Sequence, residues 1–147
     1  MSAKTDAFEN SLLDLIFTNA DLAGIGDATG LQGSTVAGSL YVSLHTSSPG
    51  ETGNQTTNEC TYTSYARVAV ARSGSGWTVT GDTVSNAAAV TFPEATGGSE
   101  TATHFGIGTD SSGTGNLLYH GALDTSRAIS AGVTPEFAIG ALDVTEA

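Results

Sequence analysis

The sequence predicts a mainly-β protein, an antiparallel β-sandwich of the jelly-roll type preceded by one amphipathic helix. Two observations lead to this prediction. Threonine, valine, glycine and serine dominate the chain, with 19 glycines and only 13% charged residues, and this composition suits short strands joined by tight turns. After residue 38, apolar and polar residues alternate with a period of two in one short segment after another.

The one expected helix runs from about Thr5 to Asp21 and ends at the glycines of GIGDATGLQGS. Its apolar residues recur every three to four positions, so they form one stripe along the helix. The stripe consists of Phe8, Leu12, Leu15 and Ile16, widened by Leu13 and Phe17. Because such a stripe must be buried, we expect the helix to pack on the chain's own sheet or on a neighbouring subunit.

The strands follow in order from LYVSLH, where Leu40, Val42 and Leu44 share one face and His45 lies on the other. The same alternation predicts strands in ARVAVAR, GWTVTG, AAAVTF, THFGIG, NLLYHGAL and PEFAIGALDVT. In the last of these the apolar parity switches at Gly140, and a bulge there is expected to bring both halves to the core. The apolar residues concerned are Phe137, Ile139, Leu142 and Val144.

A single domain is expected at this length. We expect residues 1–38 to form the helix and a glycine-rich connection, and residues 39–147 to form the β-sandwich. Segments such as SSPGETG, RSGSG and DSSGTGN supply the turns between strands.

The charge of the chain excludes several classes of partner. Fifteen acidic residues stand against four basic ones, a formal net charge of −11, so there is no basic surface to neutralise nucleic-acid phosphates or to bind an anionic membrane. Cys60 is the only cysteine, which rules out an intramolecular disulfide and agrees with folding in a reducing cytoplasm. We also expect no secretory signal and no membrane-spanning segment.

The stretch YVSLHTSSPGETG places His45 where a strand breaks into a turn. Pro49 presets the backbone angle φ, and Gly50 tolerates a positive φ. We expect His45 to lie on the polar face of its strand and to hold this turn by hydrogen bonding, with His45, Pro49 and Gly50 acting structurally.

No pattern of residues indicates catalysis or metal binding. His45, His104 and His120 are far apart, each with the outward parity of its strand, so independent exposure is expected rather than a shared metal site. The Gly-Ser-Gly of RSGSGW lacks the strand–turn–helix context of an activated serine, and DSSGTGN lacks the acids of a calcium loop. We therefore expect a protein that is not an enzyme and that has no metal and no cofactor.

Arg67 is the most informative of the four basic residues. It lies on the face opposite Val68 and Val70, and a bidentate ion pair with Glu59 or Asp143 is one prediction for it. The alternative is a solvated arginine beside a strand, whose surface pairs contribute little.

Four short segments in a fixed order resemble a family of small bacteriophage virion proteins that are often labelled tail-fibre proteins. These are LHTSSPG, the stretch ECTYTSYAR, TFPEATGGSETATHFGI and AGVTPEFAIGALDVT, and the resemblance covers about residues 40 to 145. It implies a structural β-module of the phage particle, made in the cytoplasm of a bacterial host, with no catalytic residues to transfer.

The resemblance leaves the place of the module on the virion open, with the capsid surface favoured and the tail as the alternative. On the favoured hypothesis the chain is a capsid decoration, or cement, protein that binds the major capsid protein or other virion proteins and itself as a homo-oligomer, a trimer. It would then need neither nucleic acid nor membrane, and the helix would provide the contacts. The contact residues expected are Phe8, Leu12, Leu15, Ile16 and Phe17.

The alternative hypothesis is a tail-fibre or tail-associated adaptor or receptor-binding module, which needs exposed aromatic residues at loop tips, such as Tyr62, Tyr65 and Trp77. A third hypothesis, a virion-attached glycan hydrolase, requires a carboxylate pair that no motif indicates.

Overall fold

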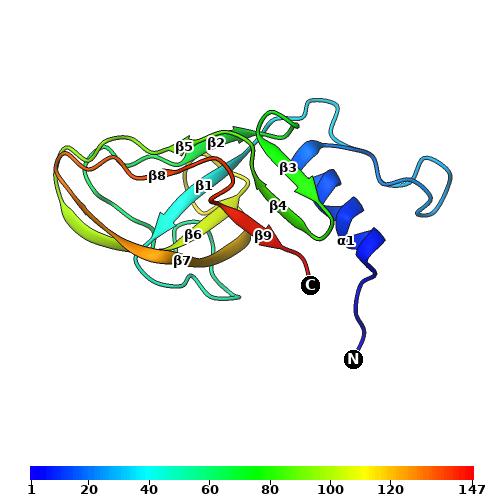
Figure 1. Ribbon diagram of the computed structural model, residues 1–147, viewed down its shortest axis with the longest axis horizontal. Helices are drawn as coiled ribbons and strands as arrows, with labels where there is room; N and C mark the ends of the chain where they lie inside the picture. Colours follow the sequence, from blue (N-terminus) through cyan, green and yellow to red (C-terminus); the bar gives the residue numbers. More distant parts are fainter. The chain divides into compact units, whose positions relative to one another are not determined.

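The computed structural model describes residues 1–147, which divide into two compact units. The first unit consists of Met1–Ser39, Ala71–Ala89 and Ala138–Ala147, and the second of Leu40–Val70 and Val90–Phe137. Strands predominate and one short α-helix lies near the N-terminus (Figure 1). The mainly-β, antiparallel and sandwich-like fold class predicted from the sequence is confirmed.

In the first unit, helix α1 (Asp6–Leu13) continues as a single π-helical turn over Asp14–Thr18. The helix ends because Asn19 adopts a left-handed conformation with φ 62°, which asparagine tolerates better than most residues. The predicted extension of the helix to Asp21 is therefore wrong. No helix of this chain has the length and the apolar character that a membrane span requires.

The helix buries one edge of the predicted stripe, Leu13 and Phe17, and not its centre. Glu9, Leu13 and Phe17 are buried, and their spacing of four places them on one face. This face packs against strands β3 (Trp77–Thr80) and β4 (Thr83–Asn86) of the same unit (Figure 1). The remaining members of the predicted stripe are half-buried or exposed: Phe8, Leu12, Leu15 and Ile16.

The sheet of the first unit contains β3 (Trp77–Thr80), β4 (Thr83–Asn86) and β9 (Asp143–Thr145), in the order β3-β4-β9. Both pairs are antiparallel. The ring of Trp77 meets that of Phe17 edge-on, with the ring centroids 4.8 Å apart, and neither side chain is more than 1% exposed. Phe17 therefore belongs to the core of its own unit, and the prediction that it contacts a partner is wrong.

The C-terminal segment forms two strands rather than one strand with a bulge. After β8 (Glu136–Phe137) the chain turns at Gly140, which has φ 73°, before β9 begins. Leu142 and Val144 are buried as predicted, but Ile139 is 71% exposed, so its predicted place in the core is wrong. The reason is the turn itself, in which Ala141 N–H donates to Ala138 C=O over 3.0 Å and leaves Ile139 at the tip.

Asn86 fixes this turn within the first unit. Its buried side-chain amide donates to Ala88 O (2.8 Å) and Ala138 O (2.9 Å), and its Oδ1 accepts from Leu142 N–H (2.9 Å). A buried amide with three hydrogen bonds is well satisfied and holds the three segments in one geometry.

Arg72 closes the carboxyl end of the helix, a role that the sequence did not reveal. Its guanidinium donates to the carbonyl oxygens of Ile16 (Nε, 2.6 Å), Leu15 (Nη2, 2.7 Å) and Ala37 (Nη1, 3.0 Å). Carbonyls at the end of a helix have no partner inside it and carry the negative end of the helix dipole, so a cation there is stabilising. Arg72 thus ties the helix to the connection that follows it.

Replacing Arg72 with methionine is expected to lower the free energy of unfolding of the first unit by about 2 kcal/mol or more, since several charge-assisted hydrogen bonds are lost together. Trp77 is the only tryptophan and lies in this unit, so its fluorescence in a urea titration measures the change. Arg72→Lys should restore only part of the loss, because an ammonium cannot form the fork. A methionine variant as stable as the wild type would contradict this role.

The second unit contains a four-stranded sheet in the order β2-β1-β6-β7. Its strands are β1 (Ser39–His45), β2 (Val68–Ala71), β6 (Ser99–Gly108) and β7 (Leu117–Ser130). In the antiparallel β1–β6 pair, Val42 lies opposite Ile107 and His45 opposite His104. The β6–β7 register shifts between Ala102, opposite Arg127, and His104, opposite Ala122, so the edge strand β7 pairs irregularly with β6 at this point.

A two-stranded sheet of β5 (Val90–Thr91) and β8 completes the second unit. Its core is aromatic. The ring of Phe137 meets the rings of Phe92 and Phe105, each with centroids 6.3 Å apart, and Tyr65 stacks on Phe92 at 6.3 Å. Since Phe105 lies on β6 and Phe137 on β8, these contacts join the two sheets of the unit.

Candidate functional site

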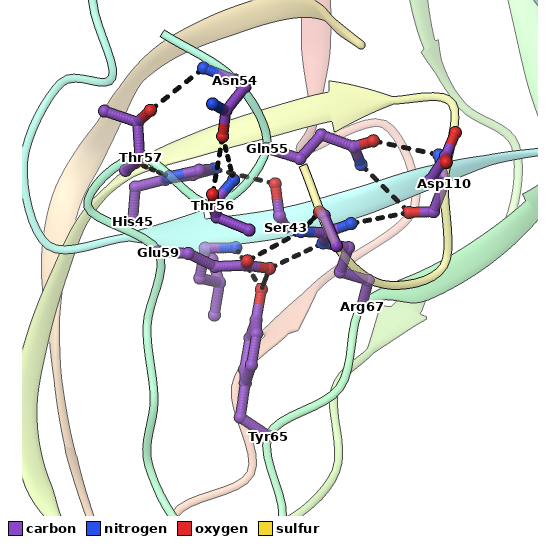
Figure 2. A network of polar contacts seen from close by, with 12 residues as sticks. Ser43, His45, Asn54, Gln55, Thr56, Thr57, Glu59, Tyr65, Arg67 and Asp110 are labelled. Carbon is purple, nitrogen blue, oxygen red and sulfur yellow. Dashed lines mark hydrogen bonds and ion pairs between the residues drawn. The ribbon is translucent and has the colours of Figure 1, made fainter. Parts of the chain in front are cut away.

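A network of polar side chains lies in the second unit, where the segment that ends at Cys60 runs back along the end of β1 (Figure 2). Thr46 N–H donates to Asn58 O and Cys60 N–H to Leu44 O, both over 2.8 Å. The residues just before this pairing, Asn54–Thr57, cover the face of the sheet to which His45 belongs. We call Ser43, His45, Gln55, Glu59, Tyr65, Arg67 and Asp110 the polar cluster.

His45 is completely buried, with 0% of its surface exposed. Its Nδ1 lies 2.8 Å from Thr57 O, and its Nε2 lies 2.8 Å from Ser43 Oγ. Because a carbonyl oxygen can only accept, Nδ1 carries the proton, and Nε2 of the neutral ring accepts from the Ser43 hydroxyl. Burial lowers the pKa of His45, and Arg67 and His104 act in the same direction, whereas the Thr57 carbonyl and Glu59 oppose them.

The expected exposure of His45 on a polar face is therefore wrong. Polar and apolar residues alternate along β1 as predicted, but residues 54–57 cover the polar face of the strand. Nothing in the local sequence pattern indicates that a later segment lies over this face. His45 also holds Thr57 rather than the nearer part of the turn. That part contains buried Pro49, and Gly50 with φ 71°, whose N–H donates to Ser48 Oγ over 3.2 Å.

Arg67 forms a bidentate ion pair with Glu59, the first of its two predicted partners. Its Nε lies 2.7 Å from Glu59 Oε1 and its Nη2 lies 2.8 Å from Oε2 (Figure 2). The Arg67 side chain is only 3% exposed and that of Glu59 12%, so this is a buried pair and not a surface one. The hydrogen bonds to Glu59 raise the pKa of Arg67, which keeps it charged.

Tyr65 extends this pair toward β1. Its hydroxyl donates to Glu59 Oε1 over 2.8 Å and accepts from Leu44 N–H over 3.1 Å. Burial, followed by the nearby Glu59 carboxylate, raises the pKa of Tyr65 well above its usual range. The phenol therefore stays protonated and serves as a fixed donor.

The same cluster clamps the hairpin loop between β6 and β7. Arg67 donates to the carbonyl oxygens of Asp110 (2.8 Å) and Gly113 (2.7 Å). The Gln55 side chain donates to Asp110 O (3.1 Å) and accepts from Asp110 N–H (2.9 Å), while its backbone N–H donates to Thr114 O (2.9 Å). The contact between Gln55 and Asp110 spans 55 residues, so no local pattern in the sequence indicates it.

Residues 3–145 match the protein family described as podophage GP4 fiber I protein gp80. The chain belongs to this family. The resemblance stated from its four sequence segments is thus confirmed, and the chain is a structural bacteriophage protein. No curated protein matches the sequence.

In this member of the gp80 fibre family, the side chains of the polar cluster have their partners within the second unit. Ser43 and His45 are arranged as a nucleophile and base would be, but both are 0% exposed. The Nδ1 partner of the histidine is a backbone carbonyl, and the donors of Arg67 are used by Glu59 and by loop carbonyls.

The three histidines of this fibre-family chain lie on neighbouring strands. His104 lies opposite His45, and His120 lies opposite Gly106, which itself lies opposite Ser43, so all three share one face of the sheet. They do not form a group of three or more ligands that could hold a metal ion.

The aromatic residues proposed for exposed loop tips are placed otherwise. Tyr62 is 3% exposed and Trp77 is 1% exposed, and Tyr65 is engaged by Glu59 and Leu44. The expectation that these rings are exposed at loop tips is therefore wrong, because each ring is held within its own unit.

Two glycines of β6, Gly106 and Gly108, are required by the polar cluster. A Cβ at Gly108 would lie 2.2 Å from Gln55 Cδ, and one at Gly106 would lie 2.6 Å from Ser43 Oγ and 2.7 Å from His45 Nε2. Glycine inside a strand is a sign of such a close approach, and this was the one signal in THFGIG that pointed to a covering segment.

Gly108→Ala is expected to destabilise the second unit by about 1–3 kcal/mol, because the methyl group overlaps the buried Gln55 side chain. Near-ultraviolet circular dichroism reports this unit, since the four tyrosines all lie in it. Gly74→Ala adds a methyl group where nothing lies within 4 Å of a built Cβ; it lies in the first unit, so its stability is followed by Trp77 fluorescence and should not change. Equal stability of the two variants would show that Gln55 is not packed against β6.

Proposed function

We propose that this chain is a subunit of a fibre carried by the phage particle. The observation that supports this most is the match of nearly the whole chain to a family described as a fibre protein. A compact β-unit whose loops are held by buried polar groups suits a structural part that must keep its shape, since such networks specify one rigid arrangement.

The copy number of the chain in purified particles tests this proposal. Quantitative mass spectrometry of peptides from this chain and from the major capsid protein gives their ratio. A fibre subunit is expected at far fewer copies than the major capsid protein. A ratio near one would contradict the fibre assignment and favour capsid decoration.

Capsid decoration is the second candidate function. Its support is that neither unit contains a coiled coil or a repeated shaft of the kind from which elongated fibres are built. In this role the module would bind the major capsid protein and stabilise the head.

In either role, we propose that the outer face of the helix makes the contact with other virion proteins. Phe8 is 38% exposed, and Leu12, Leu15 and Ile16 keep part of their surface. Phe8→Ser should reduce incorporation of the chain into particles without unfolding it. Leu118→Ser is the control, because Leu118 is similarly exposed (43%) but lies on β7; equal incorporation of the two variants would count against the helix.

We also propose that the chain assembles as a homo-oligomer, a trimer. The first unit exposes several large apolar residues, among them Ile25, Leu31 and Val36, and such residues often mark a surface that another subunit covers. Light scattering of the purified protein measures the mass directly, and a monomer at every concentration would contradict this proposal.

Finally, we propose that the protein acts through its surfaces and not by catalysis. The support is that polar side chains of the cluster are hydrogen-bonded to one another and to backbone groups inside the second unit. A hydrolase assay on host envelope glycans tests this, and turnover that is lost in a Glu59→Gln variant of wild-type stability would contradict it.

A further inference from the structure

The environment of His45 accommodates a neutral imidazole with little tolerance for a second proton. Nδ1–H donates to Thr57 O, and Nε2 accepts from Ser43 Oγ, which makes no other hydrogen bond. If Nε2 gained a proton, the Ser43 hydroxyl would have to turn and accept. Its hydrogen would then be buried without an acceptor, which is costly.

The space around the ring is closed as well. Ser43 and His45 are both 0% exposed, and not even a methyl group fits on Gly106 beside Nε2. Water therefore cannot solvate an imidazolium here while the covering segment is in place, and a buried charge without solvent or a free counter-ion is strongly disfavoured.

The charged and titratable groups that face His45 do not supply such a counter-ion. Glu59, on the covering side, already holds Arg67 in a bidentate pair and accepts from Tyr65. His104 faces His45 from β6, and on the same face of β7 lies His120. Elsewhere in the same region, burial raises the pKa of the Cys60 thiol to about 12, and the Asp110 carboxylate accepts from the Thr109 hydroxyl.

We propose that His45 is a proton-operated latch, in which protonation of its imidazole releases the covering segment Asn54–Thr57 from the face of the sheet. Thr57 O accepts from Nδ1–H in either protonation state, so the conflict lies at Nε2, which is closed in beside Ser43 and Gly106. The charged ring reaches water only when residues 54–57 leave the face of the sheet. Release gives the charged ring access to water, and it also frees the Gln55 clamp on the hairpin loop after β6. Acid would thus loosen a loop that is rigid at neutral pH.

The direction of the pH effect follows from the lowered pKa of His45. A histidine whose pKa is lower in the closed state contributes stability that is complete above its open-state pKa, about 6.5, and declines as the pH falls below it. Between pH 7.5 and pH 5.0, the opening equilibrium should therefore rise by up to about 30-fold.

Hydrogen exchange of single amides, followed by NMR and corrected for the intrinsic rate, tests the latch. The reporter amides are those of Gln55, which donates to Thr114 O, and Thr46, which donates to Asn58 O. Their protection should fall by up to about 30-fold between pH 7.5 and pH 5.0, while amides of the β1–β6 ladder keep theirs. Unchanged protection at Gln55 and Thr46 would overturn the proposal.

Two variants assign the effect to His45. His45→Asn keeps an N–H donor near Thr57 but cannot titrate, and it should remove the pH dependence. A variant with both His104→Asn and His120→Asn leaves His45 as the sole histidine of the three, and it should retain the full effect. If His45→Asn does not fold, the double variant still decides, since loss of the pH dependence there would assign the effect to another histidine.

Discussion

Arg67→Met is expected to lower the free energy of unfolding of the second unit by about 3–5 kcal/mol. The substitution leaves the Glu59 carboxylate, 12% exposed, without its counter-ion, and removing one partner of a buried ion pair costs this much. It also releases the carbonyl oxygens of Asp110 and Gly113 from their donor. Chemical denaturation followed by the tyrosine circular dichroism measures the change.

Two controls separate the buried pair from the loss of a positive charge. Arg127→Met removes the same charge from an exposed position on β7 and should change stability by no more than about 0.5 kcal/mol. Adding Glu59→Gln to Arg67→Met should recover part of the loss, since the unpaired charge disappears while an oxygen remains for Tyr65. If Arg67→Met were no more harmful than Arg127→Met, the ion pair would not support the fold.

Phe17→Ala is expected to cost about 3–5 kcal/mol in the first unit, the range for removing a buried aromatic ring. Phe17 is 0% exposed and packs edge-on against Trp77. The variant leaves a cavity beside the only tryptophan of the chain. Its unfolding is therefore followed by tryptophan fluorescence, which should also shift to the red if water enters.

Phe8→Ala is the matched control for Phe17→Ala, because it removes the same ring from the exposed side of the same helix. It should cost less than about 1 kcal/mol. If Phe8→Ala lowered the free energy of unfolding more than Phe17→Ala, Phe8 would lie on the buried face of the helix, as predicted from the sequence, and the packing of Phe17 would be contradicted.

The contrast between these two residues shows what the sequence could decide. Helical periodicity correctly predicted an amphipathic N-terminal helix, but the stripe was broad enough to be rotated by one position in either direction. The buried line Glu9, Leu13 and Phe17 is selected by β3 and β4, which come from residues 77–86. The spacing of residues within the helix holds no information about that distant sheet. It also does not show that Asn19 adopts the left-handed conformation that ends the helix.

The polar cluster was predictable only in part, for the same physical reason. The Arg67–Glu59 pair spans eight residues, and opposite charges at that range in an otherwise acidic chain made it one of two alternatives. The burial of His45 was predicted wrongly, because strand alternation shows which face of a strand is polar but not whether another segment covers that face. The bonds of Arg72 to the helix end span 56 and 57 residues, and no local signal accompanies them.

The place of the chain on the phage particle tests the central claim most directly. An epitope tag inserted between Gly74 and Ser75, in the exposed turn between β2 and β3 where a Cβ built at Gly74 meets nothing, leaves the helix face and the polar cluster intact. Electron microscopy of tagged particles decorated with a gold-labelled antibody then shows where the chain lies. Gold is expected on the fibres and not on untagged particles, whereas gold spread over the capsid shell would contradict the fibre assignment.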